Sequence, residues 1–177
     1  FFLTKKDQLP YFEEQLNFIN HDLCNMKLIG IPGGGKTRTI IEKIIYMKNN
    51  GIIIKNDNFL ILTFSRKSRE DFLTKGQGRI KNIFRNDNVR TIHSVSAIIM
   101  KNIFNRTSSN LNTLIAGLYH LLKYNNIDFS EVQCLRNCKY IFVDEAQDIS
   151  DIQYNTILKI SDICNANVIM IGDPDQN

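Results

Sequence analysis

Five short runs of apolar residues, each followed by polar residues, stand out along the chain. Four of these runs are rich in apolar residues, whereas the one within residues 88–94 carries only Val89 and Ile92; a strand with one solvated face would alternate apolar and polar side chains. The pattern therefore predicts strands that are covered on both faces, which is typical of a parallel sheet. The predicted strands lie within residues 26–31, 58–64, 88–94, 139–148 and 166–177.

Between these runs, apolar residues recur at the three- and four-residue spacing of a helix that packs on a core. In residues 35–51, for example, an isoleucine stripe continues until Asn50 and Gly51 end the helix. Because strands alternate with helices, we predict an α/β fold in which helices cover both faces of a parallel sheet. The predicted helices lie within residues 10–22, 35–51, 65–76, 95–104, 111–126 and 149–164.

The 177 residues have the length of one domain, and no apolar run approaches the roughly 20 residues that cross a bilayer. No charged-then-apolar signal segment opens the chain. The cysteines, Cys24, Cys134, Cys138 and Cys164, lack the paired spacing of a zinc site, so we expect thiols in a reducing compartment. We therefore expect a cytoplasmic or nuclear protein with no membrane partner. The net charge of +4 permits a nucleic-acid partner without establishing one.

The stretch GIPGGGKT, residues 30–37, fits the pattern G-x-x-x-x-G-K-[ST] between a predicted strand and a predicted helix. Its glycines let backbone N–H groups turn toward an anion, and the following helix adds the positive end of its dipole. We expect Lys36 to reach the β- and γ-phosphates of a nucleotide and Thr37 to offer its hydroxyl to Mg²⁺. The residues expected around the phosphates are Gly30, Ile31, Pro32, Gly33, Gly34, Gly35, Lys36 and Thr37.

Two adjacent carboxylates end the predicted strand in YIFVDEAQD. Asp144 follows four apolar residues, which places it where a carboxylate can hold the magnesium shell. Glu145 beside it can take a proton from an attacking water. Two neighbouring acids at a strand tip repel each other unless a cation lies between them. The pattern therefore favours a nucleoside triphosphatase in which Lys36 and Glu145 are catalytic.

VDEAQD together with GIPGGGKT resembles the nucleotide site of superfamily 1A helicases of the UvrD/Rep/PcrA-like group. Four further segments are similar to family motifs. LTFSRKSREDF resembles motif Ia, TIHS the T-x-H motif, IGDPDQ motif III and EEQLNFI the adenine-binding Q motif. The resemblance implies a P-loop NTPase with a RecA-like sheet: the N-terminal motor domain of an ATP-dependent DNA helicase that uses ATP and Mg²⁺.

The resemblance also implies roles for single residues. Either Gln8 or Gln15 would bind adenine, and we prefer Gln15 because of its distance along the chain from the phosphate loop. Arg38 would pack on the base. Asp173 and Gln176 match motif III, where Gln176 would sense the γ-phosphate and couple hydrolysis to strand movement.

The partners implied are single-stranded DNA, duplex junctions and the second RecA-like domain of the same full-length protein. Gln147 and Asp148 match positions that support the loop and the coupling. The residues implied to contact the strand are Thr63, Phe64, Arg66, Thr91 and His93.

Three departures from the family pattern qualify these expectations. Gly34 stands where the family usually has Ser or Thr, and residues 95–139 leave room only for a reduced helical insertion. The second RecA-like domain is absent from residues 1–177, so we expect a fragment that binds ATP weakly and hydrolyses it slowly. An RNA helicase or a helicase–nuclease motor is an alternative within motor enzymes. A non-motor P-loop module is the alternative of another class.

Overall fold

The computed structural model describes residues 13–20, 26–29, 35–80, 82–107 and 110–173. Within these ranges the strands form one five-stranded sheet in the order β1-β5-β4-β2-β3, and every neighbouring pair is parallel. The predicted parallel α/β fold is confirmed. The strands are β1 (Met26–Ile29), β2 (Phe59–Thr63), β3 (Val89–Thr91), β4 (Tyr140–Val143) and β5 (Asn167–Gly172).

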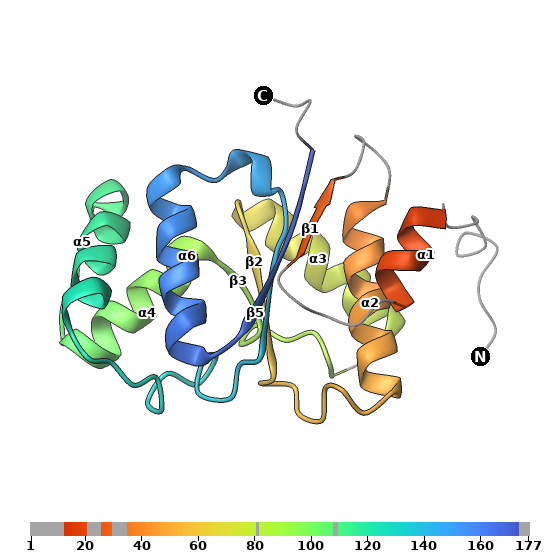
Figure 1. Cartoon of the computed structure of the whole chain (residues 1–177), viewed down its shortest axis with the longest axis horizontal. Coiled ribbons are helices and arrows are strands. Elements are labelled where there is room, and N and C mark those ends of the chain that lie inside the picture. Colours follow the sequence, from red (N-terminus) through yellow and green to blue (C-terminus); the bar gives the residue numbers. More distant parts are fainter. Residues whose placement is uncertain (1–12, 21–25, 30–34, 81, 108–109, 174–177) are drawn as a thin grey trace.

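Helices cover both faces of this sheet, as the sequence predicts (Figure 1). On one face lie α1 (Glu13–Asn20), α2 (Lys36–Asn49) and α3 (Arg66–Arg79). On the other lie α4 (Ile92–Phe104), α5 (Leu111–Tyr124) and α6 (Asp151–Cys164). A short 3-10 helix, η2 (Ala146–Asp148), connects β4 to α6.

Successive side chains of the central strands enter the two cores in turn. On β2, Phe59 and Ile61 pack with α2 and α3, whereas Leu60 and Leu62 pack with the helices of the opposite face. Alternation of this kind follows from the two-residue period of a strand. It explains why the run is continuously apolar, because neither face of β2 meets solvent.

A buried lysine joins α1 to α2. Lys43 is 1% exposed, and its Nζ donates a 2.9 Å hydrogen bond to the carbonyl oxygen of Ile19, near the end of α1. The rings of Phe18 and Tyr46 lie 5.7 Å and 5.4 Å from the same nitrogen. These contacts attach the short α1 to the longer α2 through a polar group that is satisfied inside the core.

Among the element boundaries that differ from the sequence prediction are those of β3 and α3. The strand expected to continue to residue 94 ends at Thr91, because the Thr91 side chain accepts a hydrogen bond from the Ser94 backbone and caps α4. The helix expected over residues 65–76 continues to Arg79. Both differences arise from local hydrogen bonds or packing that apolar periodicity does not record.

Across the described residues, each helix is too short or too polar to span a bilayer. The described cysteines, Cys134, Cys138 and Cys164, are free thiols, as expected. Burial raises the pKa of each of them, so they remain protonated and unreactive at neutral pH.

We expect two glycines of α3 to respond oppositely to the same substitution. A Cβ at Gly76 would lie 2.6 Å from Cγ of Phe84, a fully buried ring, whereas a Cβ at Gly78 would meet no atom within 4 Å. Both changes to Ala gain the same helix propensity. Gly76→Ala should therefore be less stable than Gly78→Ala by about 1–3 kcal/mol, the usual cost of overpacking. Urea unfolding of the two variants measures the difference, and equal midpoints would contradict it.

Candidate nucleotide and strand-binding site

The described strands end together at one edge of the sheet. Ile29 pairs with Gly172 and Thr63 with Thr91, so the carboxyl ends lie in register. In parallel α/β sheets this edge is where ligands bind. The residues that directly follow β2, β4 and β5 are Phe64, Asp144 and Asp173.

The amino end of α2 faces this edge and begins at the predicted phosphate-binding lysine. Gly35 precedes it with φ of 75°, a left-handed conformation that favours glycine. Lys36 Nζ lies 3.8 Å from the Asp173 carboxylate, which is almost completely buried at the end of β5. A cation and the backbone N–H groups of a helix start therefore lie close together, which suits an anion.

Thr37 and Asp144 come together although they are 107 positions apart in the chain. The Thr37 hydroxyl donates a hydrogen bond of 3.4 Å to Oδ2 of Asp144, and Oδ1 accepts one of 3.0 Å from the Glu145 backbone. Burial, with the nearby Glu145 charge, raises the pKa of Asp144 to about 6. Desolvation by burial thus disfavours the charged carboxylate at the position where a divalent cation would stabilise it.

The Thr37 hydroxyl oxygen and the Asp144 carboxylate are ligands of the kind that a magnesium ion binds. Mg²⁺ is held by hard oxygen ligands, commonly one or two carboxylates together with substrate phosphates and water. Among the residues that the structure describes, no group of three or more His, Cys, Asp or Glu side chains is placed to hold a metal. The Thr37 hydroxyl and the Asp144 carboxylate fit an ion whose other ligands come from a nucleotide.

Glu145 adopts a left-handed backbone conformation, with φ of 55°, which is uncommon for a residue with a side chain. Its Oε2 accepts a 2.9 Å hydrogen bond from the hydroxyl of Ser68 on α3. Sequence reasoning missed Ser68. The signal in the sequence was the spacing of the two serines: Ser65 is the N-cap of α3 and Ser68 is its third helical residue.

Gln147 connects the acidic turn after β4 to the end of β5. Its side-chain Oε1 accepts a 2.9 Å hydrogen bond from the Asp173 backbone. A Cβ on Gly172 would lie 2.9 Å from the same oxygen, so the glycine permits this close approach. The Asp148 backbone in turn donates to the Glu145 carbonyl at 3.0 Å.

Gln15 lies beside the start of α2. Its Nε2 is 3.7 Å from the position that a Cβ on Gly35 would take. The attachment of α1 through Lys43 accounts for this placement, because Gln15 lies on the same short helix as Ile19. Arg38 is half-buried in the first turn of α2.

The residues expected to contact single-stranded DNA lie on the β2–β3 side of the same edge. Phe64 is 43% exposed and Arg66 is exposed, whereas Thr63 is buried and donates to the Ser65 carbonyl at 3.2 Å. Thr91 caps α4, and His93 lies half-buried in the first turn of that helix. A small cavity at this edge is lined in part by Phe64 and Asp144.

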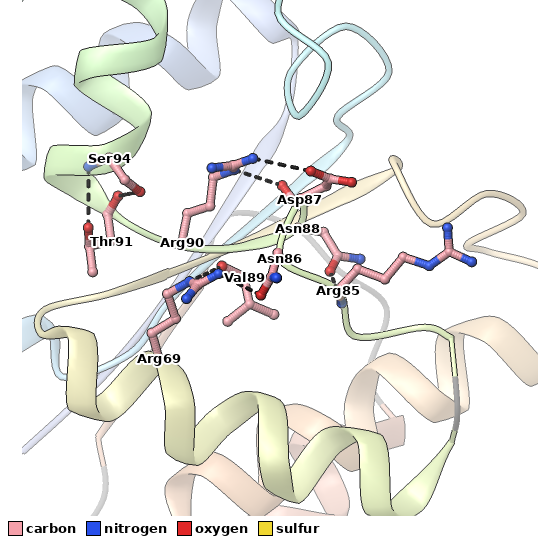
Figure 2. Close-up of polar contacts among 9 residues, drawn as sticks. All are labelled: Arg69, Arg85, Asn86, Asp87, Asn88, Val89, Arg90, Thr91 and Ser94. Carbon is pink, nitrogen blue, oxygen red and sulfur yellow. Dashed lines mark hydrogen bonds and ion pairs between the residues drawn. The ribbon is translucent and has the colours of Figure 1, made fainter.

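Arginines fix the short edge strand β3 in place (Figure 2). Arg69 of α3 donates to the Val89 carbonyl at 2.8 Å and to the side chain of Asn86 at 2.7 Å. Arg90 forms an ion pair of 3.3 Å with Asp87 in the preceding turn. These two guanidinium groups are engaged in the fold, whereas Arg66 and Lys67 at the start of α3 are exposed.

Comparison with known families identifies this arrangement. The profile of the AAA domain family matches residues 17–177, which is most of the chain. The chain belongs to the AAA domain family. The match covers the described sheet together with the helices on both of its faces.

Relatives of this AAA domain are named as helicases. It is 30% identical over 176 residues to a candidate ATP-dependent DNA helicase of Acanthamoeba polyphaga mimivirus, covering 94% of this chain and 25% of that protein. It is 46% identical over 44 residues to ATP-dependent DNA helicase srs2 of Schizosaccharomyces pombe, covering 25% and 5% of the two chains. ATP-dependent DNA helicase Rep of Buchnera aphidicola is 22% identical over 224 residues, covering 82% and 34%. The chain thus spans between 5% and 34% of the length of these relatives.

The structure therefore brings most of the described candidate residues of this AAA domain to one edge. Thr37 contacts Asp144 and Lys36 contacts Asp173, with Gln15 at the start of α2, while the side chain of Glu145, which follows Asp144, contacts Ser68 on α3. The predicted residues Gln8, Gly30, Ile31, Pro32, Gly33, Gly34 and Gln176 lie outside the described residues.

We expect the free energy of unfolding of this AAA domain to fall as the pH rises from about 4 to about 6, because of Asp144. Its pKa rises from 3.8 to about 6 on folding, so the native state binds more protons than the unfolded state in this window. Asp144→Asn should therefore gain stability over the wild type as pH rises from 4 to 7, by up to about 3 kcal/mol. Urea unfolding without Mg²⁺ measures this, with Asp71→Asn on the exposed face of α3 as the control. A pH-independent difference for Asp144→Asn would contradict the assignment.

Proposed function

We propose that this chain is the N-terminal ATP-binding domain of a UvrD/Rep-like superfamily 1A DNA helicase. It would bind ATP and Mg²⁺ at the carboxyl edge of the sheet and single-stranded DNA beside them. The observation that carries the proposal is the contact between Thr37 and Asp144, which joins the phosphate-loop helix to the acidic strand at 3.4 Å. The family match and the names of the relatives support it.

In the proposed site, each residue acts through its position. Lys36 binds the β- and γ-phosphates, and Thr37 and Asp144 hold the magnesium ion. When bound, Mg²⁺ neutralises phosphate charge and polarises the phosphoryl oxygens. Glu145 accepts a proton from the attacking water. The amino end of α2 adds its backbone N–H groups to the phosphate site.

The other proposed contacts surround this centre. Gln15 binds adenine, since a side-chain amide donates and accepts at once, and its placement beside Gly35 favours it over Gln8. Arg38 packs on the base, and Gln176 senses the γ-phosphate. Gly30, Ile31, Pro32, Gly33 and Gly34 complete the phosphate loop.

DNA binding is proposed for the β2–β3 side of the edge. The half-exposed Phe64 ring offers a stacking face that accepts any base, and the exposed Arg66 offers a cation to a phosphate. Thr63, Thr91 and His93 would contact phosphate or sugar. Translocation, unwinding at duplex junctions and the second RecA-like domain are proposals for the full-length protein, acting in the cytoplasm or nucleus. α4 and α5 form the proposed reduced insertion.

Two substitutions separate binding from chemistry. In the full-length protein, Lys36→Ala should weaken ATP binding, because the cation that contacts the phosphates is lost. Glu145→Gln should abolish turnover and leave ATP affinity intact, because only proton removal is lost. Steady-state ATP hydrolysis and equilibrium binding of a fluorescent ATP analogue measure the two effects.

Lys101→Ala and Glu131→Gln, exposed positions away from this edge, serve as matched controls with wild-type behaviour. Wild-type turnover in Glu145→Gln would favour the alternative of a nucleotide-binding module that is not a motor.

We expect Phe64→Ala to weaken binding of single-stranded DNA of any sequence. Loss of one base–aromatic stack costs about 1–3 kcal/mol, which is roughly 5- to 150-fold in Kd. Fluorescence anisotropy with a labelled oligonucleotide measures the change. Ile54→Ala, which removes an exposed apolar side chain before the amino end of β2, is the control. Unchanged affinity in Phe64→Ala would place the strand elsewhere.

A further inference from the structure

A short chain of hydrogen bonds connects the start of α3 to Glu145. The hydroxyl oxygens of Ser65 and Ser68 lie 2.8 Å apart, and the Ser68 hydroxyl is 2.9 Å from Oε2 of Glu145. Each serine hydroxyl carries one hydrogen. Since Ser68 gives its hydrogen to the carboxylate, Ser65 must give its own to Ser68. The chain therefore has one direction, from Ser65 through Ser68 to Glu145.

The two adjacent acids turn to opposite sides of β4. Asp144 accepts a hydrogen bond from Thr37, on the helix that follows β1, whereas Glu145 accepts one from Ser68, on the helix that follows β2. In the sheet β4 lies between β5 and β2, and β1 lies beyond β5. The Glu145 carboxylate is thus bound on the side away from the amino end of α2, where the phosphates are proposed to bind.

Ser65 lies between the two residues proposed to contact the strand. Phe64 and Arg66 are its neighbours in the chain, and both are exposed. Ser65 also accepts a 3.0 Å hydrogen bond from the Ser68 backbone, and its own carbonyl accepts one from Thr63. Single-stranded DNA bound to Phe64 and Arg66 would therefore act directly on Ser65, the residue that fixes Ser68.

We propose that Ser68 is a positioning residue that holds Glu145 on the α3 side of β4 and so restrains ATP hydrolysis when no DNA is bound. Strand binding at Phe64 and Arg66 shifts the start of α3 and releases the carboxylate toward the phosphates. This proposal rests on the proposed function, because it requires Glu145 to activate water. Ser68 would thus be a residue outside the nucleotide site that sets the factor by which bound DNA accelerates ATP hydrolysis.

Replacing Ser68 tests the proposal in the full-length protein. Ser68→Ala removes the hydroxyl but keeps the backbone N–H that the cap of α3 uses. We expect kcat without DNA to rise about 2- to 10-fold, the range that one hydrogen bond gives, with KM for ATP unchanged. Because kcat with saturating single-stranded DNA should stay at the wild-type value, the stimulation by DNA should fall by the same factor.

Variants of matched shape separate the hydroxyl from packing. Ser68→Thr keeps a hydroxyl and should behave as wild type, whereas Ser68→Val, which is isosteric with Ser68→Thr but lacks the hydroxyl, should behave as Ser68→Ala. Thr74→Ala removes a hydroxyl from the same helix that bonds only to the carbonyl of Glu70, and it should leave both rates unchanged. A loss of folding in Ser68→Ala would appear in urea unfolding, and the Thr and Val pair would then decide.

Two results would overturn the proposal. A fall in DNA-free kcat in Ser68→Ala would mean that Ser68 holds Glu145 in its working position, and unchanged rates would mean that the contact has no effect on hydrolysis. The double variant Ser68→Ala with Glu145→Gln must be inactive. If Glu145→Gln alone keeps wild-type turnover, the proposed function fails. If Glu145→Gln is inactive and the Ser68 variants match wild type, this inference alone fails.

Discussion

The buried carboxylate of Asp144 is the group around which the candidate site is arranged. It lies at the tip of a strand whose other residues are apolar, so the charged form loses hydration and its pKa rises. A hydroxyl from α2 and a backbone N–H compensate only part of this loss. In the proposed site, a divalent cation would offset the remaining loss of hydration. Helix α2, the turn after β4 and the end of β5 all contact this group or its neighbours.

The sheet explains how residues from distant parts of the chain reach this place. Because all strands are parallel and in register, residues that follow the strands meet at one edge whatever their separation in sequence. This geometry is visible in the sequence as apolar runs followed by acids, so Lys36, Thr37, Asp144 and Glu145 could be proposed from pattern alone. The described parts of the structure bring these four together as that geometry requires.

Other features could not be predicted, because they depend on tertiary contacts between side chains. The end of β3 at Thr91 depends on a cap that competes with strand pairing, and apolar periodicity continues across it. The placement of Gln15 beside the start of α2 depends on the docking of α1, which Lys43 provides from the middle of another helix. The hydrogen bond from Ser68 on α3 to Glu145 in the turn after β4 joins residues 77 positions apart, and no local sequence pattern predicts it.

The buried contact between Lys43 and the end of α1 has a mechanical consequence. Through it, the helix that carries Gln15 is attached to the helix that begins at Lys36. In the proposed site, the base and the phosphates of a nucleotide are therefore held by parts that move together. Motion between this domain and any neighbour would alter the surroundings of the γ-phosphate while leaving the selection of the base unchanged. Selection of the base would then be separate from the movement proposed for the full-length protein.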